Sequence, residues 1–303
     1  MRFEEKQDLD IVMNRLFTPY EERVPVVQKI MEAMMAEGII KDPQEIVNDH
    51  IAFRTMGVPQ LGVASFEKIF LHYGYTKKDY FHFEGKKLNA WWYAPPEEKY
   101  PRIFISELRV GDLSQEAQEI IRKYTDEVPT DPVDDLDLNK AEEVGHFFEK
   151  PLWSLPTYAD YQKLSEESEY AAWVIYNRYY LNHYTISVHA LKEGFNTLEE
   201  FNAFLENKGV RLNTAGGKIK TSPDGLLAQS STVADMVMAT FRGGEKVEIP
   251  GSYLEFAERR VLPEFQHLNS KDIKRKHLRD GFETGNADKI FESTFSSQTS
   301  KKA

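Results

Sequence analysis

Two short stretches decide the fold: NDHIAFRT at residues 48–55 and LNHYTISVHA at residues 181–190. Residues alternate between two faces in both, which is the pattern of a β-strand with one face toward a core. One face of the first stretch carries His50, Ala52 and Arg54. One face of the second carries His183, Thr185, Ser187 and His189. The two stretches therefore predict equivalent strands, each with an inward histidine near its start.

Each stretch is followed by the same order of elements. A predicted amphipathic helix comes first, at about 64–73 and about 197–208, and each helix ends at a glycine, Gly74 or Gly209. Strand-like runs follow at 75–83, 86–94 and 102–109, and again at 218–221, 226–231, 234–242 and 252–259. This order predicts two β-α-β-β-β modules, at 48–109 and 181–260, and hence an α+β fold built on an internal repeat.

The remaining segments are predicted to surround these modules. The first 40 residues have helical periodicity, and residues 110–180 form a helical insertion with an acidic loop at 126–139. Residues 261–303 form a C-terminal segment whose tail, SSQTSKKA, we expect to be frayed. We expect all these parts to belong to one domain, 1–303.

The composition excludes several classes of protein. The 303 residues include no cysteine, which excludes disulfides, zinc–thiolate sites, iron–sulfur clusters and a thiol nucleophile. The net charge of −11 is opposite to that of a general nucleic-acid binder. No apolar run is long enough to span a membrane, and the start, MRFEEKQDLD, lacks the pattern of a secretory signal. We therefore expect a cytoplasmic protein without a membrane or nucleic-acid partner, in which histidine and carboxylate hold any metal.

His50 and His183 are the strongest candidates for chemistry because they hold the same place in the two modules. In a pseudo-twofold fold such positions converge, and two imidazoles there bind a divalent metal well. Glu255, embedded in the strand GSYLEFAERR, can complete the site, since a carboxylate among apolar residues is costly without a cation. The alternative is a buried glutamate paired with Arg259 or Arg260.

Glu107, in the segment PRIFISELR, is the candidate counterpart of Glu255 in the first module. Four protein ligands would suit an isomerase or lyase that uses zinc or nickel. Three ligands leave three positions of an octahedron open, which can take a bidentate 2-oxo acid and O₂, the arrangement of non-haem iron(II) oxygenases. The sequence leaves both possibilities open.

Arg54 is a candidate for binding an acidic substrate. It lies four residues beyond His50 on the same strand face, so its guanidinium can clamp the far carboxylate of a dicarboxylate. The alternative is a surface arginine, or one paired with Asp49 or Glu107.

Three further polar residues are candidates for substrate contacts. His189 has the same parity as His183 and is either such a contact or a histidine of the barrel wall. Gln229 and Ser231, in the segment LLAQSSTVAD, lie at a predicted strand end and can donate hydrogen bonds to a substrate.

Four segments, NDHIAFRT, LNHYTISVH, LLAQSSTVAD and SYLEFAERR, together resemble the 2-oxoadipate dioxygenase/decarboxylase family of the vicinal oxygen chelate superfamily. The resemblance covers about residues 10 to 295. It implies a cupped, barrel-like mixed sheet in which His50, His183 and Glu255 hold iron(II), with Arg54 as the catalytic residue that binds substrate. It also implies that one catalytic domain converts 2-oxoadipate and O₂ to 2-hydroxyglutarate and CO₂, in lysine catabolism.

Two other functions are open on the sequence. One is a glyoxalase-like isomerase or lyase of the same superfamily, with Glu107 as a fourth metal ligand. The other is a non-catalytic protein of the same fold that sequesters a ligand and needs no metal triad. For a dianionic substrate, Arg54 and the metal would have to supply local positive potential within an acidic protein.

Overall fold

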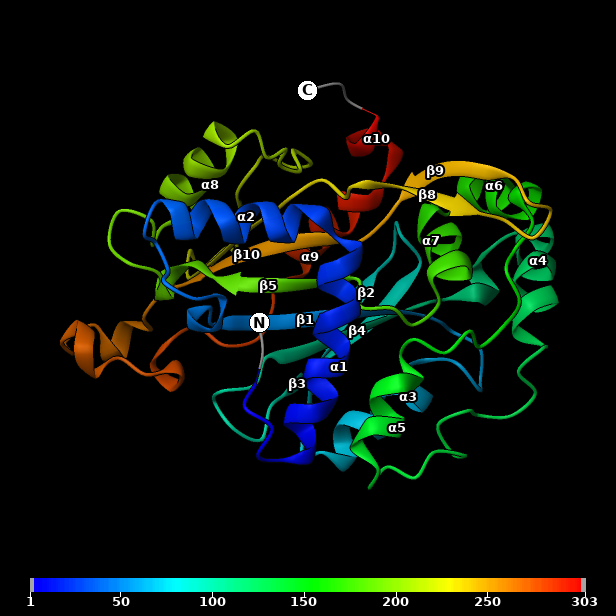
Figure 1. Ribbon diagram of the computed structural model, residues 1–303, viewed down its shortest axis with the longest axis horizontal. Coiled ribbons are helices and arrows are strands. Elements are labelled where there is room, and N and C mark those ends of the chain that lie inside the picture. The colour runs from blue at the N-terminus through cyan, green and yellow to red at the C-terminus, as the bar shows by residue number, and fades with distance from the viewer. Residues whose placement is uncertain (1–2, 301–303) are drawn as a thin grey trace.

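The computed structural model describes residues 3–300, and its centre is a curled, eight-stranded mixed sheet (Figure 1). The order of strands across the sheet is β2-β3-β4-β1-β5-β10-β7-β6. The strands are β1 (Asn48–Met56), β2 (Thr76–Phe83), β3 (Leu88–Ala94), β4 (Arg102–Leu108), β5 (His183–Ser187), β6 (Lys220–Thr221), β7 (Leu227–Ser231) and β10 (Tyr253–Arg259). With its helices, this half-barrel sheet makes the α+β fold that the sequence predicts.

The two halves of the sheet repeat one another. In the first half, β4 is parallel to β1, and β3 and β2 follow in antiparallel order. In the second half, β10 is parallel to β5, and β7 and β6 follow in antiparallel order. β1 and β5 join the halves as antiparallel neighbours. The predicted repeat is therefore confirmed, and it makes β1 equivalent to β5 and β4 equivalent to β10.

One helix of each module covers the same face of the sheet. α3 (Val63–His72) packs against Phe53 of β1, and α8 (Leu198–Asn207) packs against Phe256 of β10. Each helix is followed by a glycine with positive φ, as predicted. Because side chains alternate along a strand, His50 lies on the opposite face, which we call the inner face.

The other helices pack around the two modules (Figure 1). They are α1 (Asp8–Arg23), α2 (Pro25–Ala36), α4 (Gln115–Thr125), α5 (Ala141–Phe147), α6 (Tyr158–Glu167) and α7 (Glu169–Asn177). The predicted acidic loop at 126–139 contains only turns and bends. One apolar core joins the N-terminal helices, the insertion and both modules. None of the helices within residues 3–300 combines the length and apolar character that crossing a membrane requires.

The second module differs from its prediction at 234–242. These residues contain β8 (Met236–Thr240), which pairs with an unpredicted strand, β9 (Lys246–Pro250), in a separate two-stranded sheet. The hairpin packs Phe241 against Tyr158 of the insertion, with ring centroids 5.1 Å apart. The strand predicted within 234–242 therefore belongs to a hairpin that contacts the insertion, and it is not part of the central sheet.

The C-terminal segment covers the inner face. α9 (Thr284–Phe291) lies against β2, β6 and β7, and α10 (Ser296–Thr299) follows it. The expectation of a frayed tail is wrong for 296–299. Gln298 is buried there, and its side-chain oxygen accepts hydrogen bonds from the amide and hydroxyl of Thr214 at 3.0 and 3.1 Å. Residues 301–303 of that tail lie outside the described residues.

Candidate metal centre

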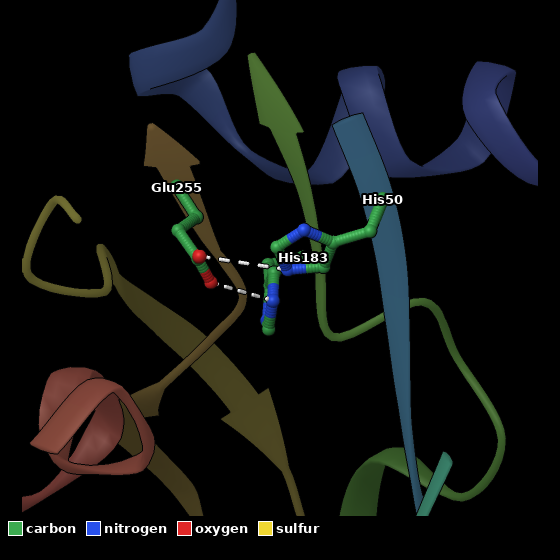
Figure 2. A group of neighbouring side chains, drawn as sticks. All are labelled: His50, His183 and Glu255. Carbon is green, nitrogen blue, oxygen red and sulfur yellow. Dashed lines mark ion pairs between the residues drawn. The ribbon is translucent and has the colours of Figure 1, made fainter. Parts of the chain in front are cut away.

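Three strands bring two histidines and a glutamate together on the inner face (Figure 2): His50 of β1, His183 of β5 and Glu255 of β10. Glu255 Oε2 lies 2.9 Å from His183 Nε2, and Glu255 Oε1 lies 3.5 Å from His50 Nε2. One ligand atom from each of the three buried residues lies within 4.8 Å of the others. Residues 3–300 contain no other group of three such side chains arranged in this way.

Strand register explains the convergence. His183 pairs with Ala52 of β1 on one side and with Tyr253 of β10 on the other. Ala52 lies two residues beyond His50, and Glu255 lies two residues beyond Tyr253. Since residues two apart share a face of a strand, all three functional side chains point to the inner face within one or two positions of each other.

Each histidine is oriented by the residue that precedes it. His50 Nδ1 donates to Asp49 Oδ1 at 2.9 Å, and His183 Nδ1 donates to Asn182 Oδ1 at 3.0 Å. With Nδ1 engaged, Nε2 of each ring is turned toward Glu255, which is how ligating histidines are usually held; Nε2 of His50 also lies 3.0 Å from Thr185 Oγ1. Neither neighbour was predicted, although an acid or amide directly before each histidine is visible in the repeat.

Glu255 has no arginine partner. Arg259 pairs with Asp49 and Arg260 pairs with Glu258, so the alternative of a structural glutamate–arginine pair is not what the chain forms. The carboxylate is positioned instead by Gln229, whose Nε2 donates to Oε1 at 2.7 Å.

The three groups differ in protonation. Burial lowers the pKa of His183 to about 4, so its imidazole is neutral. Burial alone would raise the pKa of Glu255, but His50 and His183 outweigh it and lower that pKa to about 2. Burial opposes the charged form of His50 too, yet the neighbouring carboxylates of Glu255 and Asp49 raise its pKa. At neutral pH the carboxylate is therefore ionised, and His50 is the imidazole of the pair that favours a proton.

These residues fit a divalent metal. His183 Nε2 is buried without a hydrogen-bond partner of normal geometry. A cation would satisfy that nitrogen, neutralise Glu255 and replace the proton on His50. Two imidazoles and a carboxylate suit zinc, iron or nickel better than magnesium or calcium.

Arg54 is buried beside this group, with 1% of its surface exposed. Its Nη1 donates to Thr294 Oγ1 at 2.9 Å and its Nη2 donates to the carbonyl of Phe291 at 3.1 Å, while Nε has no partner. The alternative partners, Asp49 and Glu107, are not in contact with it. A buried cation without a carboxylate is costly and favours an anionic ligand.

A cavity lies between the inner face and α9. Its walls include the triad, Arg54, Gln229 and four aromatic residues, Phe104, Tyr253, Phe282 and Phe291. The space open to the centres of water molecules is about 20 Å³, which is room for about one water. Tyr253, which the sequence analysis missed, stacks on His183 with ring centroids 4.6 Å apart, and its buried hydroxyl has no hydrogen-bond partner. Its position two residues before Glu255, on the same strand face, was the available signal.

Comparison with known proteins identifies the family. The model of the 2-oxoadipate dioxygenase/decarboxylase family matches residues 12–271. The chain belongs to the 2-oxoadipate dioxygenase/decarboxylase family. A relative from Arabidopsis thaliana, the chloroplastic 2-oxoadipate dioxygenase/decarboxylase, is 43% identical over 96% of this chain and 78% of its own length.

Solved structures agree with that family. The hydroxyglutarate synthase from Oryza sativa, solved in complex with 2-oxoadipate, has a TM-score of 0.87 and 41% identity over 99% of this chain and 96% of that one. A glyoxalase-superfamily protein from Ralstonia eutropha has a TM-score of 0.68 at 21% identity, covering 94% of this chain and 90% of that one. The predicted vicinal oxygen chelate fold is therefore confirmed.

The chain does not use Glu107 in this centre. Its Oε2 accepts a hydrogen bond from the amide of Val63 at 2.9 Å, at the start of α3 on the other face. In the second module, Glu255 of β10 pairs with Thr185, which lies two residues beyond His183. In the first module, the residue two beyond His50 is Ala52, and its partner on β4 is Phe104. The fourth ligand position of a symmetric site is thus occupied by an aromatic ring.

The predicted substrate contacts of this family member divide into two groups. Gln229 lines the cavity beside the triad. Ser231 is buried next to it but bonds Ser293, with the two Oγ atoms 2.8 Å apart, and does not line the cavity. His189 lies outside it because β5 ends at Ser187; its Nδ1 accepts from the amide of Arg259 at 3.1 Å, and it lines a different cavity. The parity argument for His189 fails where the strand stops.

Proposed function

We propose that this chain converts 2-oxoadipate and O₂ to 2-hydroxyglutarate and CO₂, with iron(II) held by His50, His183 and Glu255. The observation that carries the proposal is the combination of a three-ligand group with a buried arginine, Arg54, that lacks a carboxylate partner. The family of the chain and the 2-oxoadipate bound to its rice relative support the same substrate. The reaction balances without a further reductant, since both atoms of O₂ enter the two products.

Iron(II), when bound, would supply a place for the 2-oxo acid and O₂ to meet and the electrons that activate O₂. The residues around it have separate tasks. Asp49 and Asn182 hold the two imidazoles, and Gln229 holds the carboxylate, so that the donor atoms keep their orientation.

Arg54 would bind the carboxylate that is remote from the keto group. Its Nε and the hydroxyl of Tyr253 are buried donors of the cavity wall that lack partners, as is Nδ2 of Asn182, and an incoming carboxylate can satisfy the first two. The aromatic rings of Phe104 and Phe282 exclude water from the reacting end, and Phe291 lies beside Arg54 at the other end. Because the cavity holds only about one water as it stands, binding of a six-carbon acid requires its lining to move.

Phe104 separates this proposal from an isomerase or lyase. Such a four-ligand enzyme would need a fourth protein donor in the register position opposite Glu255, and this chain has a phenyl ring there. Three protein ligands leave positions for both the acid and O₂.

The test combines metal binding with product analysis. The purified chain is titrated with iron(II) without O₂ to obtain the stoichiometry, and then incubated in air with the C5, C6 and C7 2-oxo dicarboxylates. We expect one iron per chain, preference for the C6 acid, and equal amounts of CO₂ and 2-hydroxyglutarate. Turnover without O₂ in the presence of zinc or nickel would refute the dioxygenase. Equal rates for the three acids would refute only the substrate.

Alanine variants of the triad distinguish an enzyme from a protein that only sequesters a ligand. We expect His50→Ala, His183→Ala and Glu255→Ala each to abolish both iron binding and turnover. The matched control is His72→Ala, on the exposed side of α3, which should keep both. Full 2-oxoadipate binding by the three triad variants, with no turnover by the parent, would support sequestration.

We propose that the chain acts in the cytoplasm, whereas the Arabidopsis relative is named chloroplastic.

A further inference from the structure

A second cavity lies at one end of the central strands. It adjoins the segment that follows β10, and this segment is orange in Figure 1. The space open to the centres of water molecules is about 660 Å³ here, against about 20 Å³ beside the triad. The starts of β1 and β4 and the ends of β5 and β10 form its floor. The two cavities share no lining residue.

The walls of the second cavity carry a concentration of positive charge. The cationic residues are Arg102, Arg259, Arg260, Lys274 and Arg275. Arg259 and Arg260 form ion pairs with Asp49 and Glu258. Arg102 pairs with Asp280 through Nε at 2.6 Å and lies 3.4 Å from Asp49. Within residues 3–300, neither Lys274 nor Arg275 forms an ion pair; the acidic lining residues are Asp49, which pairs with Arg259, and Glu98, so the five cations outnumber the two carboxylates.

Two guanidinium groups of this cavity have donors without acceptors. Arg102 is 3% exposed, and its buried Nη2 has no hydrogen-bond partner. Nη2 of Arg275 is also buried and unpartnered, although its Nη1 donates to the carbonyls of Glu98 and Tyr100 at 3.0 and 2.8 Å. Leaving such donors unsatisfied costs free energy, which an anion in the cavity would recover once the two guanidinium groups turn toward the open space. Burial and the nearby Arg259 lower the pKa of Arg102 to about 10, as expected where positive charge is in excess.

We propose that this cavity is a second binding site, which holds a small oxyanion, a carboxylate or a phosphate, on Arg102 and Arg275. Guanidinium groups match the oxygens of both ions by paired hydrogen bonds. Lys274, on the exposed rim, adds a third charge. The site is distinct from the proposed active site, because Asp49 and Phe282 lie between the two cavities: Asp49 contacts His50 on one side and Arg259 on the other, and Arg259 lies 5.7 Å from the ring of Phe282.

Calorimetric titration of the full chain with inorganic phosphate, and separately with glutarate, tests the proposal. We expect at least one of the two to bind with one site per chain that Arg275→Gln weakens about tenfold or more, since that change removes a charged donor. The control is Lys163→Gln, an exposed change on α6, which should leave the affinity unchanged. Arg275-dependent binding of phosphate alone identifies a phosphate site, and of glutarate alone a carboxylate site.

A second variant covers the case in which Arg275→Gln unfolds the chain, since Arg275 also holds backbone carbonyls. Lys274→Gln changes only an exposed side chain and should weaken binding about two- to threefold, with a smaller dependence on salt. Binding of neither anion to the folded parent would overturn the proposal. Binding that neither Arg275→Gln nor Lys274→Gln alters would overturn it as well, because the anion would then bind outside this cavity.

Discussion

Asp49 links the folding of the chain to the metal centre, and Asp49→Asn tests that link. The carboxylate is buried; it accepts from Arg259 Nε at 2.6 Å and Nη2 at 2.8 Å, and from His50 Nδ1 at 2.9 Å. Burial alone would raise the pKa of Asp49, but the charges of Arg259 and Arg102 outweigh it and hold that pKa well below its usual range.

The change should lower both stability and metal affinity. Asparagine has nearly the same shape but no charge, so Arg259 becomes a buried cation without its anion, which costs about 3–5 kcal/mol. With an unfolding entropy of about 2.1 cal/mol/K per residue, a chain of 303 residues should melt about 5–8 °C lower. Loss of the carboxylate behind His50 should weaken metal binding about 10- to 100-fold.

Thermal melting of the metal-free chain and titration with iron(II) under nitrogen measure the two effects separately. Asp280→Asn is the control: it removes the other carboxylate at Arg102, but Asp280 is 59% exposed, so the change should cost under about 1 kcal/mol and leave metal affinity unaltered. A melting temperature for Asp49→Asn within about 2 °C of the parent, with unchanged iron affinity, would refute this reasoning.

The pH dependence of the same variant gives a check on the sign. Because the folded pKa of Asp49 lies below its unfolded value of about 3.9, the ion pair contributes its full stability above about pH 4. That contribution is lost as pH falls toward the folded pKa. The part of the difference in melting temperature that comes from the ion pair of Asp49 should therefore shrink below about pH 4.

Three further predictions concern the centre itself. Phe104→Glu should add a fourth ligand, tightening zinc binding about tenfold while suppressing O₂ consumption; unchanged O₂ consumption would contradict the register argument. Arg54→Lys should raise the KM for 2-oxoadipate at least about tenfold without altering iron affinity, since an ammonium cannot replace the fork of donors; a change in iron affinity alone would contradict its role. At pH values below the raised pKa of His50, iron affinity should decrease as the pH is lowered, by up to about tenfold per pH unit, because binding displaces one proton. Equal affinity at pH 5 and 8 would contradict that displacement.

The three proposed metal ligands could be predicted because each depends on local pattern and on the repeat. Alternation within a strand places His50 and His183 on one face of each, and equivalent order around them makes the strands neighbours. A carboxylate in an apolar strand, Glu255, is unusual enough to be recognised without a structure.

The counterpart in the first module could not be predicted, because it depends on register between strands. Glu107 and Phe104 differ by three positions, and a shift of an odd number of residues turns a side chain to the other face. The local sequence does not determine that register. It is seen only in the structure, where Phe104 pairs with Ala52. His189 failed for a related reason, since its parity has meaning only while β5 continues, and the strand ends at Ser187.

The asymmetry of the two modules gives the inner face its chemistry. The repeat relates Phe104 to Glu255 and relates Arg54, four residues after His50, to Ser187, four residues after His183. The first module thus lacks the carboxylate and has the cation, while the second has the carboxylate and lacks the cation. Two copies of the second module would enclose the metal with four ligands and offer an anionic substrate no buried cation, whereas two copies of the first would give the metal no carboxylate. With this division, a chain of net charge −11 presents positive potential to a dianion where the proposed metal and Arg54 adjoin, inside walls of low dielectric that strengthen the attraction.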